Sequence, residues 1–407
     1  MKFTVWYSTE SMADYIIDHT DLRHHECAKR KLLESDASKP RFFHSVPDHL
    51  KKILYLDAPD IIVELDSDPV FTIEESKEAG TGHNAFQRFS RLAASVENGI
   101  PAFYVYPEAV AIKRGNAPAK WDVINPLVGY AMESLCSIFG TPALVFFYPS
   151  LYSEKKTLEE FPEDKGLKLH KGNVRYLSCP DVDGEMRALF SCIDVLVKTL
   201  ADKGKSGIQG LLGKRAYRNR RERQLAYFHN RSIDVPKETM SPLSATVEVD
   251  TSLVADYLRR VGQVPSVGPL LPSRPKTVLY SANASFRGDP YPGALAAIDY
   301  MLCRNGPTFE DRDRNLVMVW GRPEVADGHL AIEGEASIDD FCVRVRNSEQ
   351  HNLLPLHYAD VRAKHQIPRY YMQTRYGSTY SKSKEIRVYS YFCDAILFKD
   401  GALWREG

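Results

Sequence analysis

Short apolar runs alternate with amphipathic stretches in the first part of the chain. Residues 59–65 and 70–77 are rich in Ile, Val and Phe, and their length and β-branched content are typical of strands. Between them, residues 66–69 read Asp-Ser-Asp-Pro, which predicts a turn. Apolar residues then recur at helical spacing over residues 82–98, and Gly99 ends this predicted helix.

The alternation continues after this helix. Residues 102–106 and 143–148 predict two further strands, with a helix over residues 125–140 between them and an amphipathic helix at 184–202. The order strand, strand, helix, strand, helix, strand predicts an α/β fold in which at least part of the sheet is parallel.

The composition changes at residues 203–231, where nine lysines and arginines accompany a single glutamate. Glycines recur at the start of this segment and indicate a mobile connection between two domains. We therefore predict a first domain over residues 1–203, a basic connector over 204–235 and a second domain over 236–407.

The second domain has its own pattern of elements. Helices are predicted at 250–262 and near 291–304, and strands around 277–281 and 315–320. Strand-like alternation also occurs near 386–398. These elements predict a second α/β or α+β domain.

Charge and composition narrow the class of protein. Lysine plus arginine and aspartate plus glutamate both number 53, so a basic surface for nucleic acid has to be local. No apolar run approaches the roughly 18 residues that cross a bilayer, and the first residues do not resemble a signal peptide. We therefore expect a cytoplasmic protein with no membrane partner. The seven cysteines are scattered without a CxxC pair, which argues against a disulfide framework and a cysteine-rich zinc site.

Polar residues mark the ends of the first two predicted strands. Asp60 begins the first strand, and Glu75 and Lys77 close the second. Residues two apart on a strand face the same side, and Asp60 on the neighbouring strand can lie across from them. Two carboxylates and the Ser76 carbonyl are suitable ligands for Mg²⁺, which would polarise a phosphate and activate a water. Lys77 could then orient or deprotonate that water and offset developing negative charge.

This arrangement resembles the PD-(D/E)xK nuclease superfamily, whose members include many restriction endonucleases. The resemblance covers roughly residues 45–107, with Pro59 before the aspartate and a predicted helix and strand after the lysine. It implies a restriction-endonuclease-like mixed sheet flanked by helices. It also implies that Asp60 and Glu75 bind the metal and that Lys77 is the catalytic lysine.

Superfamily members often add a polar residue from a neighbouring helix. The candidates for this accessory position are Glu34, Glu64 and Gln87. The Gln-x-x-x-Tyr pattern of the exonuclease branch is missing, because Arg91 stands where the tyrosine is expected.

Within the superfamily, the chain looks most like a type II restriction endonuclease. This implies a Mg²⁺-dependent hydrolase, with Mn²⁺ as a substitute, that cuts double-stranded DNA at a specific sequence. It also implies a homodimer or higher symmetric oligomer, because one active site per chain has to cut two strands. Basic residues interleaved with aromatic residues are candidate DNA contacts. They are Lys214, Arg215, Arg218, Arg220, Arg221 and Arg223 in the connector, and Arg369, Arg375, Lys382 and Lys384 near the end of the chain.

Other interpretations of the same residues stay open. Pro-Asp occurs three times, at residues 47, 59 and 180, so the bare pattern is weak, and Glu75 or Asp60 could simply form an ion pair with Lys77. The alternatives in function are a structure-specific or modification-dependent nuclease and a non-enzymatic DNA- or RNA-binding protein.

Overall fold

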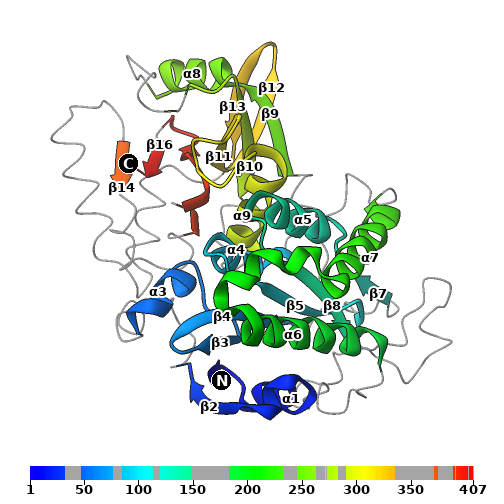
Figure 1. Ribbon diagram of the computed structural model, residues 1–407. Coiled ribbons are helices and arrows are strands. Elements are labelled where there is room, and N and C mark those ends of the chain that lie inside the picture. The colour runs from blue at the N-terminus through cyan, green and yellow to red at the C-terminus, as the bar shows by residue number, and fades with distance from the viewer. Residues whose placement is uncertain are drawn as a thin grey trace. The chain divides into compact units, whose positions relative to one another are not determined.

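In the computed structural model, the chain divides into two compact units, and each is described by itself (Figure 1). The first unit comprises Met1–Asp36 and Val46–Thr239, and the second comprises Ala37–Ser45 and Met240–Gly407. The structure describes residues 1–32, 47–76, 85–112, 120–148, 183–232, 245–262, 271, 273–282, 290–334, 371–374, 388–389, 391–401 and 403–406.

Six of the described strands form the mixed sheet of the first unit, in the order β2-β1-β3-β4-β5-β8. β3 is antiparallel to both of its neighbours, and the other adjacent pairs are parallel. The predicted α/β class is therefore confirmed. The strands are β1 (Lys2–Tyr7), β2 (Glu26–Lys31), β3 (Ile61–Leu65), β4 (Asp68–Glu75), β5 (Ala102–Pro107) and β8 (Ala143–Tyr148).

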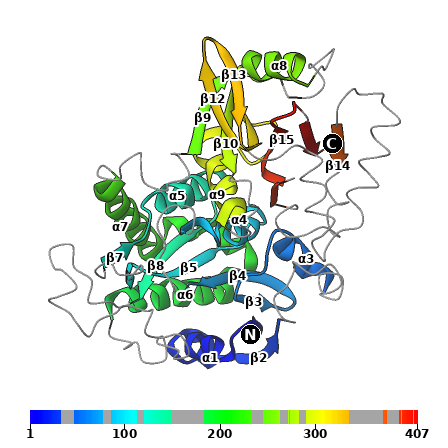
Figure 2. The same ribbon diagram turned by 180° about the vertical axis from the view of Figure 1, so that it is seen from behind.

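Helices flank this sheet on both faces, as Figures 1 and 2 show. α4 and α5 lie on one face, α1 and α6 lie on the other, and α7 passes along the β8 side of the sheet. The helical segments are α1 (Glu10–His19), η1 (Asp21–His24), α3 (Asp48–Leu54), α4 (Phe89–Glu97), α5 (Leu127–Phe139), α6 (Gly184–Lys203), η7 (Gly204–Gly213) and α7 (Arg215–Ser232). A small hairpin consists of β6 (Ala109–Ile112) and β7 (Lys120–Val123).

The predicted turn between β3 and β4 is a tight hairpin with one irregularity behind it. Asp66 and Ser67 both have positive φ, 52° and 67°, as a two-residue type I′ turn requires. Further along, the pair Glu64–Pro69 is followed by Val63–Phe71, so Val70 is an extra residue, a β-bulge. The bulge shifts the pairing of β3 with β4 by one residue from there to the end of the hairpin.

Local signals explain the ends of the helices that the sequence predicted. Asp183 caps α6 through Oδ1, which accepts from Glu185 N and Met186 N at 2.9 and 3.0 Å. α5 ends at Gly140, whose φ of 63° is left-handed. The helix predicted over 82–98 is shorter in the structure, because α4 begins at Phe89.

The predicted domain boundaries differ from the structure at the basic segment after α6. Residues 204–232 of the predicted connector form η7 and α7, and both belong to the first unit. Tyr217 and Phe228 of α7 are buried, and the Tyr217 hydroxyl donates to Cys192 O at 2.8 Å. The sparse apolar positions of this helix are therefore part of the core of the first unit, and the basic residues between them do not mark a linker.

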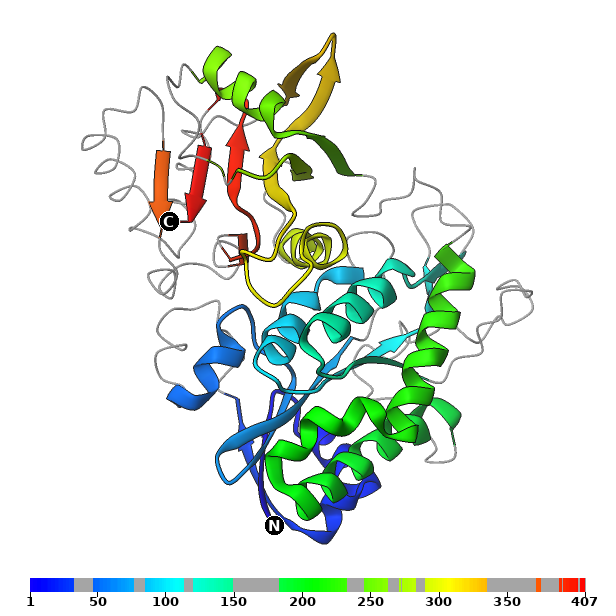
Figure 3. The same cartoon turned by 45° about the horizontal axis from the view of Figure 1, so that its top comes forward.

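The second unit contains another mixed sheet of six described strands, in the order β14-β16-β15-β11-β10-β9. Figure 3 shows these strands side by side, from green β9 to orange β14. β10, β11 and β15 are parallel to one another. The elements are β9 (Thr246–Asp250), α8 (Thr251–Arg260), β10 (Lys276–Ala282), α9 (Pro290–Ile298), a π-helical turn (Asp299–Cys303), β11 (Arg314–Trp320), β12 (Arg322–Ala326), β13 (His329–Glu333), β14 (Tyr371–Thr374), β15 (Ala395–Phe398) and β16 (Leu403–Glu406).

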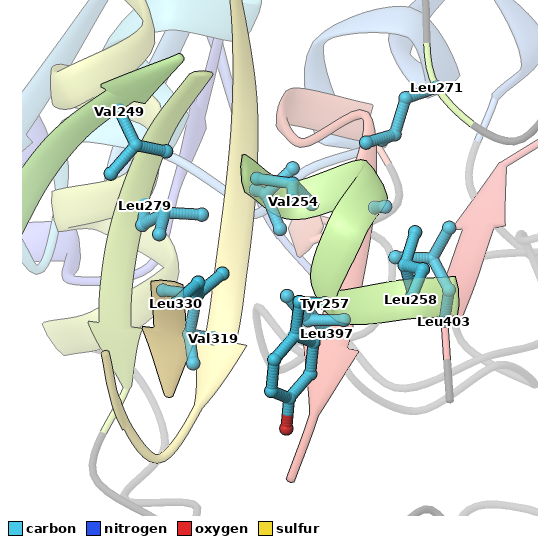
Figure 4. Packing of buried hydrophobic residues seen from close by; sticks show 12 residues of the cluster. Val249, Val254, Tyr257, Leu258, Leu271, Leu279, Val319, Leu330, Leu397 and Leu403 are labelled. Atoms are coloured by element: carbon cyan, nitrogen blue, oxygen red, sulfur yellow. The ribbon is translucent and has the colours of Figure 1, made fainter. Parts of the chain in front are cut away.

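The core of the second unit lies between α8 and one face of its sheet. Figure 4 shows Val254 of α8 on the side of Leu279 of β10 and Val319 of β11, and Leu258 of α8 beside Leu403 of β16. All five side chains are buried. The strand-like alternation predicted near 386–398 is a strand only in β15, because the described residues at 388–392 are helical.

No helix of the described residues is long and apolar enough to span a membrane.

Candidate active site

The predicted meeting of two strand ends is present in the first unit. Asp60 directly precedes β3, Glu75 ends β4, and the antiparallel pairing brings both to the edge of the sheet where β4, β5 and β8 end. We call this the carboxyl edge. Asp60 Oδ2 accepts a hydrogen bond from Glu75 N at 2.8 Å, and Asp60 Oδ1 accepts one from Ser8 Oγ at 2.9 Å. Two hydrogen bonds therefore fix the orientation of the Asp60 carboxylate.

The pairing register decides which glutamate shares a face with Asp60. Ile61 pairs with Ile73, so the register places Asp60 beside Glu74, on the face of the sheet that α4 covers. Because side chains alternate along a strand, Glu75 points to the opposite face. The sequence placed Asp60 across from Glu75, whereas the hydrogen bond between these residues runs through the Glu75 main-chain amide.

Behind Asp60 lies a buried cluster of charges that the sequence analysis did not identify. Arg91 of α4 donates to Asp57 Oδ2 at 2.6 Å and to Glu74 Oε1 at 2.8 Å, and all three residues are buried. Arg88 Nε lies 3.4 Å from the same Glu74 oxygen. The other oxygen, Glu74 Oε2, has no hydrogen-bond partner among the described residues. We call Asp57, Glu74, Arg88 and Arg91 the Glu74 cluster.

Burial and the neighbouring arginines act on the pKa of Glu74 in opposite directions. Burial raises the pKa of the Glu74 carboxyl well above its usual range, since a charged carboxylate is poorly solvated there. Arg91 and Arg88 oppose this shift, while Asp60 and Asp57 increase it. A charged residue inside the apolar run of β4 was the available sequence signal, because a buried carboxylate requires a partner.

The donor set at the carboxyl edge suits a divalent cation of the magnesium type. Asp60 keeps free lone pairs on both oxygens, and Glu74 Oε2 is an acceptor without a donor in the described structure. The Ser76 amide donates to Val105 O at 3.0 Å and ties the end of β4 to β5. The described residues contain no cluster of three or more His, Cys, Asp or Glu arranged to hold a metal. The oxygen atoms that this edge offers a cation are those of the Asp60 carboxylate, the second oxygen of Glu74 and a main-chain carbonyl.

The remaining predicted catalytic and accessory residues lie in different places relative to the carboxyl edge or outside the described residues. Lys77 and Glu34 lie outside the described residues. Glu64 is four residues along β3 from Asp60, about 13 Å away, so it does not belong to this edge. Glu64 Oε1 instead lies 2.5 Å from His49 Nε2 of α3. Gln87 is half-buried just before α4.

Arg220 does not serve as the predicted DNA contact, because it is 4% exposed and covers the open edge of the sheet. β8 is the last strand, and its outer backbone groups have no neighbouring strand. Arg220 Nε donates to Val145 O at 2.7 Å, and Gln224 Oε1 accepts from Val145 N at 2.7 Å. Glu185 Oε2 accepts from Phe147 N at 3.1 Å. These side chains replace a strand partner and prevent β8 from pairing with another chain.

The other predicted DNA contacts of α7 divide into paired and unpaired cations. Arg221 Nε lies 2.8 Å from Glu133 Oε2 of α5, and Arg223 lies 3.3 Å from Glu185. Lys214, just before α7, and Arg215 and Arg218 within it are exposed and form no ion pair with a described residue.

These unpaired cations lie away from the carboxyl edge. Tyr227 is close to that edge, because its hydroxyl donates at 2.9 Å to Glu108 Oε1, directly after β5. Arg218 is about 14 Å nearer the start of the same helix. The C-terminal candidates Arg369, Arg375, Lys382 and Lys384 lie outside the described residues.

No protein-family model matches the chain, and neither a curated protein nor a solved structure matches it.

Proposed function

We propose that the chain is a divalent-metal-dependent endodeoxyribonuclease of the type II restriction class, with a restriction-endonuclease-like first unit. The observation that supports this most directly is the contact between Asp60 Oδ2 and Glu75 N at the carboxyl edge. The elements around it follow the order that the superfamily resemblance implies: the β3–β4 hairpin, then α4, then the parallel strand β5.

Each residue of the edge has a separate task in this proposal. Asp60 and one of the two glutamates at the end of β4, Glu74 or Glu75, hold Mg²⁺ or Mn²⁺ with the Ser76 carbonyl. The bound cation lowers the pKa of a water and polarises the phosphate. Ser8 keeps the Asp60 carboxylate oriented through its hydroxyl hydrogen bond. Lys77 orients or deprotonates the attacking water and offsets the negative charge that develops on the phosphate.

The Glu74 cluster adds a second candidate for the carboxylate beside Asp60. Glu74 shares the face of Asp60, and Glu75 does not. Arg91 holds Glu74 by one oxygen, so the other oxygen can turn toward a cation. Comparing variants at these two consecutive positions decides which glutamate completes the site.

The partner and the assembly are part of the same proposal. Double-stranded DNA is the substrate, the second unit reads the bases, and a homodimer places one active site on each strand. The test below includes both modified and plain DNA, because a modification-dependent nuclease would cut only the modified DNA.

The central prediction is that Asp60→Asn abolishes cleavage. Wild type, Asp60→Asn and Lys77→Ala are incubated with plasmid and phage DNA, modified and unmodified, in Mg²⁺, Mn²⁺ or EDTA. We expect discrete metal-dependent fragments from wild type and a loss of at least about 100-fold in rate for both variants. Glu74→Gln and Glu75→Gln are assayed in parallel, and the glutamate that binds the cation shows the larger loss and the weaker Mn²⁺ affinity by calorimetry.

Asp68→Asn is the matched control, because Asp68 is an exposed carboxylate at the opposite end of β4. It should cleave like wild type. Cleavage that persists in Asp60→Asn would place the active site elsewhere. If wild type cuts no DNA with either metal, the nuclease proposal is wrong.

A further inference from the structure

The edge strand β2 ends in three consecutive basic residues at the carboxyl edge. Lys29 is already neutralised, because its Nζ lies 2.8 Å from Glu10 Oε1 and 2.7 Å from Asp14 Oδ1. Arg30 and Lys31 are exposed, and neither forms an ion pair with a described residue. These residues carry no strong sequence signal, because β2 is short and only Cys27 and Ala28 in it are apolar.

Trp6 holds the Arg30 side chain in place. The two residues are partners in the pairing of β1 with β2, and Arg30 Cζ lies 5.4 Å from the centroid of the Trp6 ring. An aromatic face attracts a guanidinium while leaving the N–H donors at its rim available. Arg30 is therefore a pre-oriented cation that suits a bidentate contact with a phosphate.

The position of Arg30 relative to Asp60 follows from the sheet register. β1 pairs Trp6 with both Arg30 and Ile62, so these three side chains lie on one face. Asp60 is two residues from Ile62 and therefore lies on the same face. β2 and β3 are two strand spacings apart, about 10 Å, and Asp60 is a further two residues, about 7 Å, along the strands from the level of Arg30. The two residues are therefore about 12 Å apart, a distance that a few nucleotides of one DNA strand span.

We propose that Arg30 binds a backbone phosphate of the DNA strand whose scissile phosphate lies at Asp60, a few nucleotides away. The inference rests on the proposed function, since it takes DNA as the substrate. It makes β2 the substrate-positioning side of the carboxyl edge, in place of the more distant cations at the start of α7. A different explanation is that these charges only keep the edge strand from pairing with another chain.

Binding measured without cleavage separates these explanations. Anisotropy of a labelled duplex of about 30 base pairs is followed in EDTA and in Ca²⁺ over a range of salt concentrations. We expect Arg30→Gln to weaken binding about tenfold and to reduce the slope of log K against log salt by about one. Arg30→Lys should lose less affinity, because it keeps the charge and loses only the planar fork.

Lys29→Gln is the matched control on the same strand, because its charge is already paired. Its salt slope should change by much less than one. Circular dichroism confirms that each variant is folded. The inference is overturned if Arg30→Gln binds DNA with the affinity and salt slope of wild type. It is also overturned if Arg30→Gln self-associates and still binds DNA as tightly as wild type. A wild type that does not bind DNA overturns it as well.

Cleavage assays on the same proteins report on the proposed function separately. If Arg30→Gln weakens binding while wild type cuts no DNA in Mg²⁺ or Mn²⁺, the phosphate contact stands and the nuclease proposal fails. If wild type cuts DNA and Arg30→Gln binds it normally, the nuclease proposal stands and the phosphate contact fails.

Discussion

Both units bury a cluster of charged residues, and the two clusters differ in how completely their charges are paired. In the second unit, Asp299 is wholly buried between two arginines: its Oδ2 accepts from Arg304 at 2.6 Å, and its Oδ1 lies 2.8 Å from Arg312 Nε. Arg312 and Arg274 in turn contact Asp394 at 3.3 and 3.1 Å.

The Glu74 cluster of the first unit is paired less completely. Arg91 is shared between Asp57 and Glu74, and Glu74 Oε2 has no donor among the described residues. Both clusters incur the cost of burying charge, which is offset only where every charge has a partner. Both oxygens of Asp299 face an arginine, at 2.6 and 2.8 Å, which supports a structural role, whereas the second oxygen of Glu74 has no donor among the described residues and belongs to the cluster beside the carboxyl edge.

Asp299→Asn should have the largest effect on stability, because it leaves two buried arginines without their shared carboxylate. We expect a loss of about 3–5 kcal/mol in the free energy of unfolding. Urea unfolding followed by tryptophan fluorescence measures it, since Trp320 of the same unit is buried. A loss of less than about 1 kcal/mol would show that Asp299 is not a necessary partner and would remove the contrast between the clusters.

Glu74→Gln should change stability less than Asp299→Asn, and its effect should depend on pH. Glu74 binds its proton more tightly in the folded chain, because burial raises its pKa. The contribution of Glu74 to the free energy of unfolding of the wild type therefore falls as pH rises from the unfolded-state pKa of about 4.3 toward the raised folded value. The glutamine variant lacks this slope, so it should gain stability relative to wild type as pH rises.

Parallel urea titrations of the two proteins between about pH 5 and pH 8 test this sign. A constant difference between them over that range would mean that Glu74 is charged in the folded chain throughout, with Arg91 outweighing burial, and the predicted sign would be wrong.

Lys205→Gln should have the smallest effect and gives the baseline for both clusters. Lys205 Nζ lies 3.0 Å from Asp68 Oδ1, and both side chains are exposed to water. We expect a change within about 0.5 kcal/mol that disappears at high salt. A larger change in the same urea assay would indicate that η7 depends on this contact.

The parts of the fold that the sequence predicted correctly are those with local signals. β3, β4, α5 and α6 follow from apolar runs, caps and terminal glycines within the segments themselves. α7 was mistaken for a linker because its partner is the open edge of β8, far away in the sequence. No local pattern reveals that an arginine and a glutamine will replace a neighbouring strand.

The candidate site was predictable in its place but not in its detail. Strand ends marked by Asp60 and Glu75 were enough to locate one edge of the sheet. The buried contacts of Arg91 join a helix to two separate segments, so they depend on tertiary packing. Whether Asp60 shares a face of the sheet with Glu74 or with Glu75 depends on the exact pairing of β3 with β4. Alternation within one strand does not specify this pairing.

The bulge at Val70 shifts the pairing register of the hairpin by one residue. From the turn to the bulge, the two position numbers of each pair add up to 133, and beyond the bulge they add up to 134. If Val70 paired with Val63 instead of bulging, Asp60 would stand opposite Ile73, on the face of Glu75, and would no longer share a face with Glu74. The bulge therefore selects the acidic neighbour of Asp60, and a deletion of Val70 would remove the bulge while leaving Asp60 opposite Glu74.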